Sequence, residues 1–124
     1  MRTSPCNDLV MTSTDWPGEW VRAALPGAVL ALVSEEDAYG YLIAQRLAAA
    51  GFGTIKGSTL YPLLARLEQD GVLASTWQDG SGGPGRKYYS VTDAGQHRLQ
   101  EHRSFWQDFT ATTTAVLAEK RNTR

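Results

Sequence analysis

The spacing of apolar residues changes once along the chain and then changes back, and this order restricts the fold more than any other feature. Up to Gly71, apolar residues recur every three to four positions, as in helices that bury one face. In residues 72–78 and 87–92, apolar and polar residues alternate, as in strands. Helical spacing returns after Thr92. The chain is therefore expected to be mainly α-helical, with one small two-stranded β-hairpin.

Three helices are expected before the hairpin. The first covers residues 20–33, where Pro26-Gly27 predicts a kink or a delayed start, because proline removes a backbone hydrogen bond and clashes with the preceding turn. The second covers residues 39–50, and Asp37 is its candidate N-cap. The third covers residues 56–71 and carries leucines on one face.

The hairpin and a fourth helix complete the pattern. Between the two strands lies DGSGGPGR, residues 79–86, whose four glycines and one proline predict a flexible loop, longer than a two-residue turn. Thr92 or Asp93 is the expected cap of the last helix, which extends to about Leu117.

Composition argues against several classes of protein. The net charge of −1 gives no global basic field, although residues 56–124 carry nine Lys and Arg against seven acids. The single cysteine, Cys6, permits neither a disulfide framework nor a Cys/His zinc pattern, which fits a reducing cytoplasm. The longest apolar run, residues 25–33, falls far short of the ~20 residues that span a bilayer, so no membrane association is expected.

The chain offers no recognisable catalytic or metal chemistry. No nucleophile with a paired base, no carboxylate constellation and no metal-binding cluster is evident, so neither an enzyme nor a cofactor is expected. His97 and His102 are five residues apart, which misses the four-residue spacing of a helical ligand pair.

Three helices, a hairpin with a glycine-rich loop and a further helix form the order of a winged helix-turn-helix. In such motifs the second helix of the pair enters the DNA major groove with its N-terminal residues first. Gly57, Ser58 and Thr59 are small enough to let the third helix approach DNA closely, while its later leucines hold it on the core. Arg86 and Lys87 at the base of the hairpin loop can pair with phosphates.

Three stretches of the chain, taken together, resemble the PadR family of bacterial transcriptional regulators. They are DAYGYLIAQRL, GSTLYPLLARLEQDGVL and GGPGRKYYSVTDAG, and the resemblance covers roughly residues 21–109. The short C-terminal part is similar to the subfamily with a single C-terminal helix. The resemblance implies a homodimer that represses transcription and that a small ligand releases from DNA.

The resemblance and the motif order together nominate residues for two sites. The candidate DNA-binding residues are Tyr39, Gly40, Lys56, Ser58, Thr59, Tyr61, Arg66, Arg86 and Lys87. The candidate ligand-binding residues are Trp106, Leu25 and Phe109, with Trp106 placed to stack on a flat aromatic molecule in the dimer cleft. Four alternatives stay open: Tyr61 as a core aromatic, Arg66 as a solvated charge, Arg86 and Lys87 as a solvated strand start, and Trp106 as a packing residue of the dimer.

One position departs from the family pattern at the start of the third helix. Lys56 stands where many relatives have a capping Ser or Thr, so the cap is expected to slip to Ser58. Pro62 would then lie near the first interior hydrogen bond and bend the helix.

The last helix carries a seam of residues at coiled-coil spacing. Within each of two sets, the residues recur every seven positions along the helix. This spacing predicts packing against a second copy of the chain. The candidate dimerisation residues are Leu99, His102, Trp106, Phe109, Thr113 and Val116.

The expected organisation is a flexible N-terminal tail (1–18), a winged helix-turn-helix DNA-binding domain (19–92), a C-terminal dimerisation helix (93–119) and a short tail (120–124). The expected function is that of a homodimeric, sequence-specific DNA-binding regulator, a repressor that reads a palindromic operator and that a flat ligand releases. The alternative is a winged-helix module that binds a protein or a ligand without binding DNA, which the near-neutral charge favours.

Overall fold

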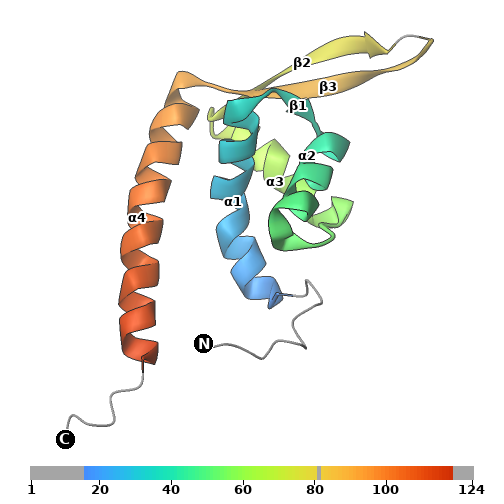
Figure 1. The fold of residues 1–124 in the computed structure, drawn as a ribbon. Coiled ribbons are helices and arrows are strands. Elements are labelled where there is room, and N and C mark those ends of the chain that lie inside the picture. Colours follow the sequence, from blue (N-terminus) through green and yellow to red (C-terminus); the bar gives the residue numbers. More distant parts are fainter. Residues whose placement is uncertain (1–15, 81, 119–124) are drawn as a thin grey trace, which may run out of the picture.

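A computed structural model describes residues 16–80 and 82–118 of the 124-residue chain. In Figure 1, α1, α2 and α3 group beneath a small sheet, the β2–β3 hairpin extends beyond them, and α4 runs beside α1. This architecture confirms the expected class, a mainly helical winged helix-turn-helix with a long C-terminal helix. In chain order, the elements are α1 (Gly18–Glu35), β1 (Ala38–Tyr39), α2 (Gly40–Leu47), a π-helical turn (Ala48–Phe52), α3 (Gly57–Gln69), β2 (Leu73–Gly80), β3 (Gly83–Val91) and α4 (Asp93–Leu117).

One hydrophobic core lies between the helices and the sheet. The four leucines of α3 on the expected face are all buried, which confirms the predicted orientation of this helix. Each such side chain contributes about 1.5–3 kcal/mol relative to exposure in water. The other buried apolar residues are Leu25, Val29, Leu30, Val33, Ala38, Ile43, Leu47, Val72, Leu73, Tyr89 and Leu99.

The first helix differs from the expectation at Pro26-Gly27. α1 begins at Gly18 and continues through Pro26 to Glu35, so the predicted delayed start is wrong. A Cβ atom at Gly27 would collide with the imidazole of His102. The glycine therefore leaves room for α4 to pack closely on α1.

The segment between α1 and α2 contains a strand that the sequence analysis missed. Ala38 and Tyr39 pair with β3 opposite Tyr89 and Tyr88, so the sheet has three antiparallel strands in the order β1-β3-β2. Asp37 is not the cap of α2, because Tyr39 precedes that helix. Burial of Ala38 and contact between the Tyr39 and Tyr88 rings favour strand pairing over an earlier helix start.

The N-cap of the third helix lies earlier in the chain than expected. Lys56 is its N-cap, and its carbonyl accepts hydrogen bonds from the backbone N–H groups of Thr59 and Leu60, both at 2.9 Å. The predicted slip to Ser58 is wrong, because the backbone carbonyl makes these bonds without a capping side chain. The helix ends before Gly71, whose φ of 80° lies in the left-handed region that glycine adopts easily.

The glycine-rich segment between the strands is more regular than expected. β2 and β3 pair from Leu73 opposite Val91 out to Gly80 opposite Gly83, with one irregularity after Gln78. The prediction of a long flexible loop over residues 79–86 is therefore wrong. Its glycines permit close strand approach, since a Cβ atom at Gly80 would lie 2.5 Å from the carbonyl oxygen of Pro84.

The start and end of α4 agree with the expectation. The Thr92 hydroxyl accepts a hydrogen bond from the Gly95 N–H at 3.0 Å and donates one to the Gly71 carbonyl at 2.7 Å. Thr92 thus caps α4 and also ties its start to the end of α3.

The expected tails fall mostly outside the described residues. Residues 1–15, with Cys6, and residues 119–124 are not described, and Gly18, the last residue of the expected N-terminal tail, already belongs to α1. In the described part of the chain, no helix has both the length and the hydropathy needed to cross a bilayer.

Candidate nucleic-acid interface

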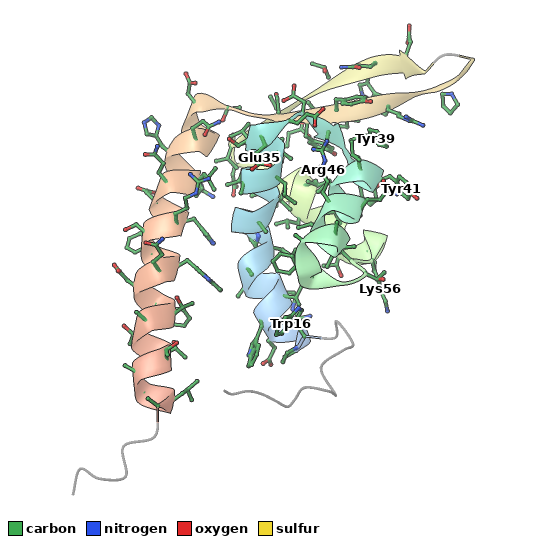
Figure 2. All side chains as sticks on the ribbon, viewed as in Figure 1. Trp16, Glu35, Tyr39, Tyr41, Arg46 and Lys56 are labelled. Carbon is green, nitrogen blue, oxygen red and sulfur yellow. The ribbon has the colours of Figure 1, made fainter. Side chains whose placement is uncertain are left out.

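Most residues nominated for DNA binding come from the starts of α2 and α3 and from the hairpin, whereas Arg66 lies in the last turn of α3. Figure 2 shows Tyr39, Tyr41 and Lys56 on the side of the domain that faces away from α4. The hairpin extends over this same side, as Figure 1 shows. The side chains form one candidate surface, although they come from three separate segments of the chain.

The first turns of α3 combine exposed and buried positions. Ser58 is exposed, Thr59 is partly buried, and Leu60 is buried in the core. Lys56 is exposed directly before the helix, and Arg66 is exposed further along it. The N-terminal end of α3 therefore presents small polar groups, backbone N–H groups and a cation together, a combination that suits a phosphate-bearing partner.

Tyr61 links the two helices of the helix-turn-helix. It is 51% exposed, so it is not a core aromatic. Its ring lies against Gly40, where a Cβ atom would be only 2.5 Å from Tyr61 Cε1. Gly40 is needed here for space, and the contact fixes the start of α2 against α3.

Arg86 is held in place by an aromatic ring. Its guanidinium carbon lies 4.5 Å from the centroid of the Tyr39 ring, and Tyr39 packs edge-on against Tyr88 at 5.3 Å. A cation–π contact of this kind orients the guanidinium but leaves its charge uncompensated. Among the described residues, no carboxylate forms an ion pair with Arg86.

Lys87 has a different environment from its neighbour. Its Nζ atom lies 3.2 Å from Glu68 Oε1, and Glu68 Oε2 accepts a hydrogen bond of 2.6 Å from the Ser75 hydroxyl. The Ser75 hydrogen bond and then Lys87 hold the pKa of Glu68 below its usual value. Lys87 therefore joins β3 to α3, and its charge is largely compensated.

A groove between the hairpin and the helices contains residues that the sequence analysis did not nominate. Tyr41 and Gly85 line it together with Trp77, which is 72% exposed. Trp77 pairs with Lys87 across the two strands, so both side chains share one face of the hairpin. The alternation of residues along the strand was the signal that could have placed Trp77 there.

Comparison with known proteins identifies the family. Residues 29–101 match the model of the transcriptional regulator PadR-like family.

The chain belongs to the PadR-like family of transcriptional regulators.

Individual relatives agree with this assignment. A transcriptional regulator of Mycobacterium tuberculosis is 38% identical over 85 residues, which are 68% of this chain and 78% of the relative. The crystal structure of a PadR family regulator from Eggerthella lenta superposes with a TM-score of 0.76 at 38% identity, over 82% of this chain and 88% of that one. A PadR-like regulator from Bacillus cereus gives a TM-score of 0.73 at 31% identity, over 83% of this chain and all of that one.

Membership of the PadR-like family confirms the coarse function. The chain is a DNA-binding transcriptional regulator and not an enzyme. The family therefore favours the DNA-binding reading over a winged-helix module that binds only proteins or ligands.

The nominated ligand and dimer residues of this PadR-like regulator fall into a buried and an exposed group. Leu25 and Leu99 are 1% and 2% exposed, because both pack in the core of their own protomer. This burial leaves Leu25 little surface for a ligand and Leu99 little for a second copy. The exposed part of the seam therefore begins after Leu99.

Trp106 lies at the boundary between the packed and exposed parts of α4. Its ring stacks on that of His102, with centroids 5.8 Å apart and an angle of 10° between the ring planes. The centroid of the Phe109 ring lies 6.2 Å from that of Trp106. Past this point Thr113 is exposed, and Val116 is 77% exposed. The C-terminal half of α4 thus carries an apolar face that the other described residues of the chain do not cover.

Proposed function

We propose that this PadR-like regulator is a homodimeric repressor that binds a palindromic operator in a sequence-specific manner. The observation that carries the proposal is the exposed start of α3, with Lys56 before it and Arg86 of the hairpin on the same side of the domain. In this reading each subunit places α3 in a major groove, where Ser58 and Thr59 approach base edges.

Phosphate contacts position the complex. Lys56, Arg66 and Arg86 supply about six contacts per dimer, which corresponds to a slope of about −5 in a plot of log affinity against log salt concentration. Lys87 contributes little to this slope, because Glu68 already compensates its charge.

The apolar face of α4 supports the homodimer. Phe105, Phe109 and Val116 are 71%, 62% and 77% exposed, a large apolar area for one helix to leave in water. A second copy related by a two-fold axis would cover this face and place the two α3 helices about one turn of DNA apart.

The same face suggests how a ligand would act. A flat aromatic molecule in the cleft between the two α4 helices would stack on Trp106, with Phe109 beside it. Such a ligand releases DNA if it favours a spacing of the α3 helices that no longer matches the groove repeat. A regulator of this kind works in the cytoplasm, where the chromosome is accessible.

The test uses fluorescence anisotropy with duplexes from the region upstream of the protein's own gene. Arg86→Ala should weaken binding about tenfold and make the salt slope shallower by about 2, since two contacts per dimer are lost. Arg103→Ala is the matched control, because Arg103 is an exposed arginine on α4. Equal affinity of the two variants, or no binding by the wild-type protein, would contradict the proposal.

A further inference from the structure

We infer that the groove between the hairpin and the starts of α2 and α3 seats one sugar–phosphate strand of the DNA, and that Trp77 and Tyr41 contact its deoxyribose groups. This inference rests on the proposed function and adds an apolar contact to the basic and polar residues nominated above.

The groove gathers three large exposed aromatic side chains. Trp77 is 72% exposed, Tyr41 62% and Tyr61 51%, and all three line the same concave surface. Single exposed aromatics are common on protein surfaces, whereas several that converge on one groove indicate a binding surface. Tyr41 and Tyr61 come from the helices, and Trp77 comes from the opposite wall.

The fold turns Trp77 toward the groove. Trp77 and Lys87 are cross-strand partners, and Lys87 reaches Glu68 on α3, so their shared face of the hairpin looks toward the helices. Trp77 Cε3 lies 3.7 Å from the position of a Cβ atom at Gly85. This is an ordinary van der Waals distance, so the indole ring lies alongside Gly85 of the hairpin.

The charges of the groove favour a polyanion. Arg86 lines it and has no ion-pair partner among the described residues, whereas Glu68 compensates the charge of Lys87; no aspartate or glutamate is among the lining residues. Arg86 is oriented by Tyr39 and keeps its full charge. A chain that alternates phosphates with apolar sugar faces matches a cation placed beside aromatic rings.

The position of the groove identifies which part of DNA it meets. A helix in the major groove and a hairpin in the adjacent minor groove must straddle the strand that separates the two grooves. The surface between α3 and the hairpin is this groove. Trp77 and Tyr41 would therefore grip the backbone through apolar contacts, which do not depend on counterion release.

The experiment measures affinity for a bound duplex at several salt concentrations. Trp77→Ala should weaken binding roughly tenfold at every salt concentration and leave the salt slope unchanged, because the lost contact is apolar. Trp77→Phe, which keeps an aromatic ring, should retain most of the affinity. Thr76→Ala, at the adjacent exposed position on the other face of β2, should bind like the wild-type protein.

Three outcomes would overturn the inference. Wild-type affinity in Trp77→Ala would overturn this inference but not the proposed function. A loss of affinity that disappears at high salt would also overturn it, because such a loss is typical of a charge effect. A wild-type protein that binds no duplex would overturn the proposed function and this inference together. If Trp77→Ala does not fold by circular dichroism, Tyr41→Ala on the facing wall carries the same expected result.

Discussion

The side chains around Lys87 show how one contact changes the role of a nominated residue. Arg86 and Lys87 are adjacent in the sequence, and both were nominated as phosphate contacts. The structure pairs Lys87 with Glu68 and places Arg86 on Tyr39. Of these two residues, Arg86 therefore keeps the uncompensated charge that can pair with a phosphate.

The Glu68 carboxylate should make stability depend on pH. Its pKa is lowered in the folded state by the Ser75 hydroxyl and by Lys87, so its contribution is complete above the ordinary glutamate pKa of about 4.3 and is lost as pH falls through the lower folded value. Glu68→Gln should therefore be less stable than the wild-type protein at pH 7. The difference should shrink below about pH 4.

Urea denaturation at a series of pH values measures this effect. Asp93→Asn is a suitable comparison, since Asp93 is an exposed carboxylate at the start of α4. A difference in unfolding free energy between the wild-type protein and Glu68→Gln that stays constant from pH 7 to pH 3 would contradict this prediction. It would show that ionisation of Glu68 does not contribute to stability.

Packing between elements depends on glycines at two crossing points. Gly27 lets His102 of α4 lie against α1, and Gly40 lets Tyr61 of α3 lie against the start of α2. Neither glycine has a positive φ, so space rather than backbone conformation requires the missing side chain.

Gly27→Ala should loosen the contact between α1 and α4. The new methyl group would collide with the His102 ring, and relief of this overlap should cost about 1–3 kcal/mol of unfolding free energy. The midpoint of urea denaturation measures the change. Gly18→Ala is the control, because its Cβ atom would meet only the flexible Arg22 side chain, at 3.4 Å. Equal midpoints for the two variants would contradict the packing role of Gly27.

The elements that the sequence predicted best are those with a long periodic pattern. The leucines of α3 recur over several turns, and all are buried as expected. β1 was missed because two residues, Ala38 and Tyr39, are too few to show a period, and their partners lie some fifty residues later in the chain. The length of strand pairing in the hairpin was underestimated, because glycines permit close strand pairing as well as flexibility.

The candidate site was predictable only in part for a related reason. Residue type and motif position nominated Arg86 and Tyr61, but the contacts that define their roles are long-range. The ion pair of Lys87 with Glu68 and the cation–π contact of Arg86 with Tyr39 arise only when α3, β1 and the hairpin meet.

The last described helix, α4, is only partly covered by the other described residues of the chain. The first half of α4 packs on α1 through Leu99 and His102, and its second half exposes Phe105, Phe109 and Val116. A small domain gains stability by burying such a face in a partner. This exposed face supports the proposed two-fold dimer.

Trp106→Ala should weaken dimerisation or ligand binding and leave the protomer folded. Trp106 is 36% exposed at the boundary of the uncovered face, so its loss removes apolar contact area from the proposed cleft. Sedimentation velocity measures the dimer, circular dichroism checks the fold, and quenching of tryptophan fluorescence reports a bound aromatic ligand. Gln107→Ala is the adjacent exposed control. A dimer of unchanged affinity, with ligand binding also unchanged, would show that Trp106 has neither role.

The proposed spacing of the two α3 helices can be measured with two duplexes that carry the same palindromic operator. In one, five base pairs are inserted between the half-sites, which rotates them by about half a turn of DNA relative to each other. We expect two chains to bind the unaltered duplex tightly and the insertion to abolish tight binding. One chain per duplex, or equal affinity for the two duplexes, would contradict a dimer that presents its paired α3 helices to successive major grooves.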